Sequence, residues 1–193
     1  VTVTDANDAP VSTSGGGGGT GSVNAAENQT AVTTVTSTCA DSDNVAYSLT
    51  GGADQAKFAI NAASGALTFS SAPDFETPTD ANTDNDYLVE VTVTDDGSGS
   101  LTDVQTITVT VVGGNDDPII TSLDGNATSG VSAAENQTAV IDVNATDADD
   151  DTLTYSISGG ADKALFDIDV GTGELTFVAA PDYETPTDAD ADN

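Results

Sequence analysis

The chain repeats itself with a period of 108 residues, and this repeat constrains its fold more than any other feature. Ala-Glu-Asn-Gln-Thr at 26–30 returns at 134–138, and Gly-Gly-Ala-Asp at 51–54 returns at 159–162. Between residues 23–85 and 131–193, 38 of 63 aligned positions are identical, and the alignment needs no gap. Self-similarity at a fixed period indicates a tandem array in which each repeat is one structural unit.

The sequence of one repeat predicts an all-β unit. Apolar residues alternate with Thr, Ser or other polar residues in six runs, which clusters of Gly, Asp, Asn and Pro separate. These runs are 30–38, 45–50, 57–60, 66–70, 87–94 and 101–112. A short run after each linker proline, such as Ile119–Ser122, supplies a further strand. About seven strands in roughly a hundred residues are typical of an immunoglobulin-like Greek-key sandwich.

The core of the first repeat is expected at the apolar positions of these strands. We expect it to contain Tyr47, Phe58, Ile60, Leu67, Phe69, Tyr87, Val89, Val91 and Ile107. The Gly15–Gly19 run predicts a flexible stretch in the first strand region. A phosphate-binding loop is disfavoured there, because neither a helix nor a Lys follows.

The repeat register also predicts the domain boundaries. Residues 1–8 are expected to end the last strand and linker of a preceding repeat, 9–116 to form one repeat, and 117–193 to form a second. Asn193 aligns with Asn85, so the second sandwich is expected to be incomplete in this chain and to lack its last two strands. Either those strands follow in the same protein, or another chain supplies them by strand addition.

Charge excludes several classes of function. The chain has 33 acidic residues against two Lys, without Arg or His, and a formal net charge of −31. Nucleic-acid binding is excluded, because phosphate recognition needs clustered basic side chains. Without His and with a single Cys, the chain lacks catalytic triads and zinc motifs. We therefore predict that it is not an enzyme, although paired carboxylates keep acid–base chemistry open, and a disordered acidic chain is a minor alternative.

No membrane span is expected in this segment, because no apolar run is long enough to cross a bilayer. Cys39 has no partner for a disulfide. We expect it to be a small, partly buried side chain at a strand end, with metal binding or oxidation as the alternatives.

Strand direction predicts where the acidic residues gather. Because each antiparallel strand reverses the direction of the chain, every second connection of a sandwich lies at the same end. The first connection, the connection after the fifth strand and the exit from the last strand should therefore meet at the far end of repeat one. The loop after the second strand of repeat two should face the same junction. The residues placed there are Glu27, Asp74, Glu76, Asn115, Asp116, Asp117, Asp147, Asp149 and Asp151.

Carboxylates crowded in this way repel one another by about 1 kcal/mol or more per close pair. Either their pKa values rise, or a cation neutralises them. Oxygen donors without thiolate or imidazole favour Ca²⁺, which accepts 6–8 oxygens in irregular geometry, over Mg²⁺. The sequence therefore predicts a calcium site at the joint between repeats.

These motifs resemble those of cadherin repeats, of the bacterial cadherin-like kind found in large surface adhesins. Ala-Glu-Asn at 26–28 and 134–136 is similar to the family's x-E-N motif, and Pro-Asp-Phe-Glu and Pro-Asp-Tyr-Glu are similar to its L-D-R-E. Asp-Ala-Asp at 147–149 is similar to D-x-D, and residues 5–10 and 113–118 are similar to the family's linker. The resemblance implies seven-stranded sandwiches whose junctions bind up to three Ca²⁺, and a role in adhesion.

Departures from the family pattern concern both joints. Gly113 replaces the first linker Asp, and Asp117 takes the place of the final Asn. Cys39 stands where the second repeat has Asp147, so the joint before repeat one is expected to bind fewer ions or to bind them weakly. The weaker metal candidates are Asp5, Asn7, Asp8, Asp41, Asp43, Asp95, Glu135, Asp182 and Glu184.

A separate acidic loop has alternating oxygen donors at Asp80, Asn82 and Asp84, and again at Asp188, Asp190 and Asp192. It is similar to the opening of an EF-hand loop but lacks the Gly at position six and the Glu at position twelve. A solvated turn is therefore favoured over a calcium site.

The first functional hypothesis is a calcium-binding extracellular repeat of a cell-surface adhesin, stiffened at its junctions and serving cell–cell or biofilm adhesion. Its expected partners are adjacent repeats and like repeats on other molecules. The alternative is a subunit of an extracellular filament, completed by strand donation from another chain. A carbohydrate-binding module is disfavoured, because the chain has no Trp and its few aromatic residues lie at core positions.

Overall fold

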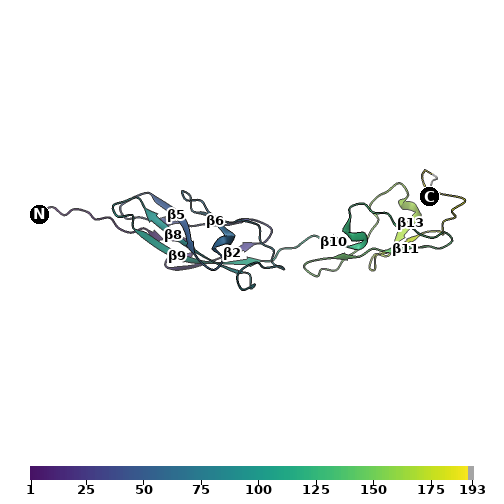
Figure 1. The fold of residues 1–193 in the computed structure, drawn as a ribbon, viewed down its shortest axis with the longest axis horizontal. Coiled ribbons are helices and arrows are strands. Elements are labelled where there is room, and N and C mark those ends of the chain that lie inside the picture. The colour runs from purple at the N-terminus through teal and green to yellow at the C-terminus, as the bar shows by residue number, and fades with distance from the viewer. Residues whose placement is uncertain (191–193) are drawn as a thin grey trace. The chain divides into compact units, whose positions relative to one another are not determined.

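The computed structural model describes residues 1–190 and divides into two compact units. Unit 1 comprises Val1–Gly114, and unit 2 begins at Asn115. Both are built from β-strands and short 3₁₀ turns, which confirms the all-β prediction (Figure 1).

Unit 1 is a sandwich of two main sheets. The first has the strand order β2-β9-β8-β5 and the second β3-β7-β6, while the short strands β1 and β4 pair separately. The strands are β1 (Val11–Ser12), β2 (Thr20–Ala26), β3 (Ala31–Thr34), β4 (Ser37–Thr38), β5 (Val45–Gly51), β6 (Phe58–Ile60), β7 (Ala66–Phe69), β8 (Asp86–Asp95) and β9 (Thr102–Val112). β2 runs parallel to β9, and the other pairs are antiparallel.

The core of unit 1 lies between these sheets and follows the alternation of the strands. On β8, Tyr87, Val89, Val91 and Val93 are buried while the residues between them are more exposed. The buried apolar residues are Ala25, Val35, Tyr47, Phe58, Leu67, Phe69, Tyr87, Val89, Val91, Val93, Ile107, Val109 and Val111. Eight of the nine expected core residues are fully buried, and Ile60 packs against them partly buried.

Two elements of unit 1 differ from the sequence prediction. The expected strand over 30–38 is divided into β3 and β4, which pair with different partners. β2 was not predicted, because its sequence Thr-Gly-Ser-Val-Asn-Ala-Ala has little apolar alternation. Its position follows from the backbone ladder with β9, from Thr20 opposite Thr106 to Ala26 opposite Val112.

The glycine run leads into β2 through a 3₁₀ turn, η1 (Ser14–Gly16). Gln105 of β9, which is 1% exposed, fixes this segment by donating to the carbonyl oxygens of Ser14 and Gly18. Its own oxygen accepts hydrogen bonds from the Ser12 and Ser14 hydroxyls. The expected flexible stretch is thus tied to the sandwich by a buried amide.

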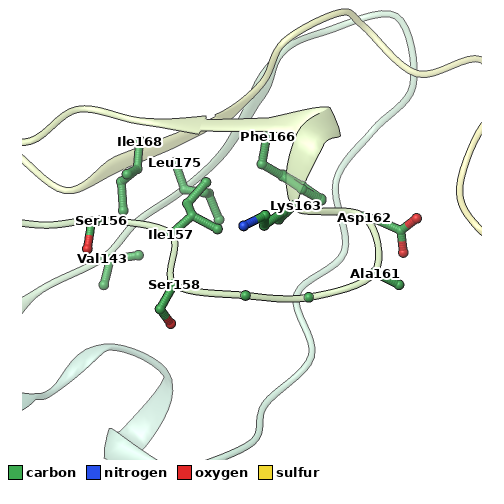
Figure 2. Close-up of a pocket in the computed structure, with 12 residues that line it drawn as sticks. Val143, Ser156, Ile157, Ser158, Ala161, Asp162, Lys163, Phe166, Ile168 and Leu175 are labelled. Carbon is green, nitrogen blue, oxygen red and sulfur yellow. The ribbon is translucent and has the colours of Figure 1, made fainter.

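Unit 2 repeats much of this architecture in the residues that the structure describes. β11 (Ala139–Asp142), β14 (Glu174–Phe177) and β13 (Phe166–Ile168) form a sheet in that order, and β10 (Ile119–Ile120) pairs with β12 (Ala145–Thr146). Three further 3₁₀ turns are η2 (Gln55–Lys57) in unit 1, and η3 (Ser122–Gly125) and η4 (Lys163–Leu165) in unit 2. In unit 2 the residues that correspond to β2 and β5, 128–134 and 153–159, form no strand, so the strand predicted for the second copy of 45–50 is wrong for the described residues (Figure 2).

Candidate metal centres

The first acidic cluster, called the Glu27 cluster, joins two loops at one end of unit 1. Glu27 directly follows β2, and Asp74 and Glu76 lie in the connection between β7 and β8. Ligand atoms of these three side chains all lie within 4.8 Å of one another. Glu27 is only 5% exposed, whereas Asp74 and Glu76 are exposed. The sequence prediction placed all three at this end.

The backbone around Glu27 explains the repeated Ala-Glu-Asn motif. Asn28 adopts a left-handed conformation with a φ of 60°, which Asn tolerates better than most residues, and donates its N–H to the carbonyl of Pro73. The turned chain directs the Glu27 carboxylate inward, where it accepts the N–H groups of Phe75 at 2.8 Å and Gly114 at 2.5 Å. Glu27 therefore connects the β7–β8 loop to the segment that follows β9.

Unit 2 rebuilds this arrangement in the Glu135 cluster. Ligand atoms of Glu135, Asp182 and Glu184 lie within 4.8 Å of one another, and all three residues are exposed. Asn136 has a φ of 61° and donates its N–H to Pro181 at 2.9 Å. The Glu135 carboxylate accepts the Tyr183 N–H at 3.1 Å. The motif thus determines its own local geometry in both repeats.

A second cluster in unit 1, called the Asp41 cluster, contains Cys39, Asp41 and Asp43. Their ligand atoms also lie within 4.8 Å of one another, and each residue is partly exposed. The linker reaches this cluster directly, because Asp8 donates its N–H to Asp41 at 2.5 Å. Asn7 donates its side-chain amide to the buried Asp95 at 3.1 Å. Asp5 is exposed and accepts the Ala6 N–H.

The Asp41 cluster concentrates negative charge in little space. Burial, followed by the charges of Asp96, Asp41 and Asp95, raises the pKa of Asp43 above its ordinary value. Gly97 is required here, because a Cβ at that position would overlap the side-chain oxygens of Asn7 and Asp43. The backbone is thus shaped to let oxygen atoms from three segments converge.

The corresponding loop of unit 2, called the Asp149 loop, follows β12. Asp147 accepts the N–H groups of Asp149 at 3.0 Å and Asp151 at 3.2 Å. Asp116 donates its N–H to Asp149 at 2.6 Å, which repeats the contact between Asp8 and Asp41. Asn115 donates its side-chain amide to the Asp116 carbonyl. Asp117, like Asp151, is exposed.

The loop at Asp80 is a different kind of site. The carboxylate is 4% exposed and accepts the backbone N–H groups of Asn82, Asp84 and Asn85. Burial acts to raise the pKa of Asp80, but these hydrogen bonds outweigh it, so the pKa lies below its ordinary value. The expected solvated turn is therefore wrong for Asp80, which is the buried anchor of the loop. In the second copy, Asp192 lies outside the described residues.

Sequence reasoning missed one buried acid near this loop. Asp54 is 4% exposed and accepts the N–H groups of Ala81 at 2.7 Å and Leu88 at 2.9 Å. The Gly-Gly-Ala-Asp motif that contains it occurs in both repeats, so the sequence indicated its importance but not the contacts it makes. Asp54 holds the Asp80 loop against β8, which is a structural function.

The donor sets of these clusters determine which ions they suit. The Glu27 cluster, the Glu135 cluster and the Asp149 loop offer oxygen atoms alone, which suit hard cations that accept many oxygen ligands. The Asp41 cluster adds the Cys39 sulfur, a softer donor in the position that Asp147 occupies in unit 2.

A comparison of the sequence with protein families matches residues 21–112 to the cadherin domain. Unit 1 is a cadherin domain. Human Protocadherin Fat 4 is 31% identical over 144 residues, and human Protocadherin Fat 1 is 33% identical over the same length. Each match covers 73% of this chain and 3% of the relative, so the chain spans a small part of these proteins.

Solved structures show the same fold. The crystal structure of human Protocadherin-24 EC1-2 has a TM-score of 0.53 and 20% sequence identity, and the match covers 94% of this chain and 82% of that one. Among residues 1–190, no helix is long and apolar enough to cross a membrane.

Proposed function

We propose that the chain is a calcium-binding extracellular repeat segment of a large cell-surface adhesin. In this proposal, Ca²⁺ at the joint between the repeats holds them in a fixed orientation. The segment thereby acts as a stiff spacer in cell–cell or biofilm adhesion, and its role is mechanical and adhesive rather than catalytic. Adjacent repeats, and like repeats on other molecules, are its partners.

The Glu27 cluster is the observation that supports calcium binding most directly. Three carboxylates within 4.8 Å include Glu27, which is 5% exposed. Like charges at such distances repel by about 1 kcal/mol per pair even in water. The two N–H groups that Glu27 accepts stabilise its charge but leave Asp74 and Glu76 facing it. A divalent cation would convert this repulsion into attraction.

Unit 2 supplies the other half of the proposed joint. Asn115, Asp116 and Asp117 form the linker, and Asp147, Asp149 and Asp151 form the loop that receives it. The hydrogen bond from Asp116 to Asp149 supports this assignment, because it holds the linker backbone against the acidic loop. Side-chain and carbonyl oxygens from the two units would together approach the 6–8 ligands that Ca²⁺ accepts.

The Asp41 cluster is proposed as a weaker site of the same kind, at the joint that precedes unit 1. The absence of a side chain at Gly97 lets the side-chain oxygens of Asn7 and Asp43 approach each other there, which supports a shared oxygen site. Cys39 removes one hard ligand from the set, so Ca²⁺ would bind there with lower affinity. The Glu135, Asp182 and Glu184 side chains would serve a following joint.

Calorimetric titration of EDTA-stripped protein with Ca²⁺ tests the proposal. We expect binding heat and a rise in melting temperature. The Asp147→Ala, Asp149→Ala double variant should lose most of the binding heat and of the rise in melting temperature. The Asp142→Ala, Asp167→Ala double variant removes the same charge from exposed strand positions and should keep both. Absence of heat and of stabilisation in the unaltered protein would refute calcium binding. Equal loss in both variants would show a non-specific charge effect.

The second candidate function is a subunit of an extracellular filament that completes its repeats with strands from another chain. In this function, a strand from another chain would cover the counterparts of core side chains that are half-exposed in the described residues of unit 2. Sedimentation and negative-stain imaging separate the two functions. Polymers of this chain would support the filament, and a monomer that binds Ca²⁺ would contradict it.

A further inference from the structure

Phe75 lies in the chain between two carboxylates of the Glu27 cluster, but its own side chain is apolar. Both polar groups of its backbone are fixed. The N–H donates to the Glu27 carboxylate at 2.8 Å, and the carbonyl oxygen accepts the side-chain amide of Asn85 at 2.9 Å. The residue is 38% exposed and does not belong to the buried core. Its place in the structure therefore needs an explanation other than core packing.

The Phe75 ring packs on the backbone of Gly113, the first residue after β9. A Cβ atom at Gly113 would lie 3.1 Å from Cδ1 of the ring, 3.4 Å from Cγ and 3.5 Å from Cε1. The first distance is shorter than the best separation of two carbon atoms, so a side chain at this position would have to displace the ring. The absence of a side chain at Gly113 thus lets the ring lie against the start of the linker.

This contact gives the start of the linker a support that its sequence lacks. By the period of 108 residues, Gly113 and Gly114 correspond to Asp5 and Ala6 in the linker before unit 1. One linker therefore begins with a carboxylate and the other with two glycines. Glycine has more backbone freedom than any other residue. Without support, Gly113 and Gly114 would be the loosest point of the linker.

Gly114 is held as well. Its N–H donates to Oε1 of Glu27 at 2.5 Å, while Oε2 of Glu27 accepts the Phe75 N–H. Glu27 also donates its own N–H to the carbonyl of Val112 at 3.1 Å. Three consecutive residues, 112–114, are thus each in contact with Glu27 or Phe75. We call these contacts, together with the ring on Gly113, the Phe75 clasp.

The clasp does not depend on charge alone. Asn85 has a φ of 67°, and its backbone carbonyl accepts the Val111 N–H at 2.8 Å. Its side-chain amide donates to the Phe75 carbonyl, so this neutral residue connects the end of β9 to the loop that carries the ring. The packing of the ring on Gly113 is neutral too. We therefore expect the clasp to hold whether or not a cation is bound.

We propose that Phe75 is a positioning residue that holds Gly113 and Gly114 in place without metal and thereby prepares the linker for Ca²⁺. The first part concerns unit 1 alone, and the second rests on the proposed calcium function. The ring supplies no ligand. It acts by ordering two glycines in advance, so that Ca²⁺ does not have to overcome their backbone entropy on binding. Packing thus compensates for the carboxylate that Gly113 lacks.

Measurement of ¹⁵N relaxation in EDTA tests the metal-free part. In the unaltered protein, the heteronuclear NOEs of Gly113 and Gly114 should equal those of β9. Phe75→Ala should lower them to the values of exposed loops, and Phe75→Tyr, which keeps the ring, should not. Leu88→Ala is the matched control, because Leu88 is 37% exposed and lies on β8 outside the clasp. It should leave both glycines ordered.

A second variant tests the clasp from the side of the linker. Gly113→Val keeps Phe75 but places a side chain where the ring lies, so the Gly114 amide should become more mobile. In a Phe75→Ala background, the same substitution should cause no further loosening, because no ring remains to be displaced. Additive loosening would show that residue 113 acts independently of the ring and would contradict the clasp.

Calorimetric titration with Ca²⁺ tests the positioning role. Phe75→Ala should bind Ca²⁺ about tenfold more weakly than the unaltered protein, with the same number of ions, because no ligand has been removed. A tenfold loss corresponds to about 1.4 kcal/mol, close to the cost of ordering the backbone of one residue. Phe75→Tyr and Leu88→Ala should bind like the unaltered protein.

The two parts of the proposal fail separately. Mobile Gly113 and Gly114 amides in the unaltered protein in EDTA, or equal order in Phe75→Ala, would overturn the clasp, whether or not Ca²⁺ binds. Equal Ca²⁺ affinities of Phe75→Ala and the unaltered protein would overturn the positioning role and leave the calcium function intact. Glycines that are ordered and loosen in Phe75→Ala, in a protein that binds no Ca²⁺, would support the clasp and refute the calcium function.

Discussion

Replacing Glu27 by Gln should have little effect on unit 1 without calcium and a large effect with it. In EDTA, the change removes repulsion from Asp74 and Glu76, each with ligand atoms within 4.8 Å, which stabilises by about 2 kcal/mol in total. It also weakens the two hydrogen bonds from Phe75 and Gly114, which costs about 1 kcal/mol each. The free energy of unfolding should therefore change by less than about 1 kcal/mol.

Calcium changes this balance because Glu27 would then be a ligand. At a Ca²⁺ concentration about one hundred times the Kd of the unaltered protein, binding adds about 2.7 kcal/mol to the free energy of unfolding. If the variant binds about a hundredfold more weakly, only about 0.4 kcal/mol of that gain remains. The difference between the two proteins should thus appear almost entirely on addition of Ca²⁺.

Urea unfolding in EDTA and in Ca²⁺ measures both quantities, with Glu90→Gln on β8 as the matched control. The control should gain as much from Ca²⁺ as the unaltered protein. The reasoning fails if Glu27→Gln gains equally from Ca²⁺. It also fails if the variant is destabilised by several kcal/mol in EDTA, since the hydrogen bonds of Glu27 would then outweigh the repulsion.

Three further predictions concern other parts of unit 1. Asp80→Asn should lower the free energy of unfolding by about 1–3 kcal/mol at neutral pH. The pKa of Asp80 is lowered in the folded protein, so its stabilisation is present above the ordinary pKa of 3.8 and is lost as the pH falls through the folded pKa. Urea unfolding should therefore show the difference between the variant and the unaltered protein shrinking in acid. Tyr87→Ala should cost about 3–5 kcal/mol by leaving a cavity beside Phe58 and Phe69, while Leu88→Ala should cost much less, and equal denaturation midpoints would contradict the packing described. Cys39→Asp should strengthen Ca²⁺ binding in calorimetry relative to Cys39→Ser, and equal affinities would exclude Cys39 from the site.

The sequence predicted those features of the fold that depend on side-chain alternation. Val89 and Val91 are buried on β8 because the strand period of two places them on one face. The same reasoning brought Glu27 together with Asp74 and Glu76, because strand direction determines at which end a loop lies. The wider assignment of these residues to a shared calcium joint remains a prediction.

Features that depend on backbone pairing or on buried polar contacts could not be predicted in this way. β2 is positioned by its parallel ladder with β9, and its side chains carry little signal of that pairing. Gln105 occupies an inward position on β9 where an apolar residue would be expected, and its role becomes clear only from its contacts with Ser12 and Ser14. Asp54 and Asp80 are similar cases, since both carboxylates accept hydrogen bonds from backbone N–H groups of distant or irregular segments.

The central claim, that Ca²⁺ fixes the two repeats relative to each other, is tested most directly by measuring distances between them. Spin labels at Ala46→Cys and Thr154→Cys, two exposed positions related by the repeat, can be introduced into a Cys39→Ser background. Double electron–electron resonance should give a broad distance distribution in EDTA and a narrow one in saturating Ca²⁺. Distributions of equal width in both conditions would contradict the account.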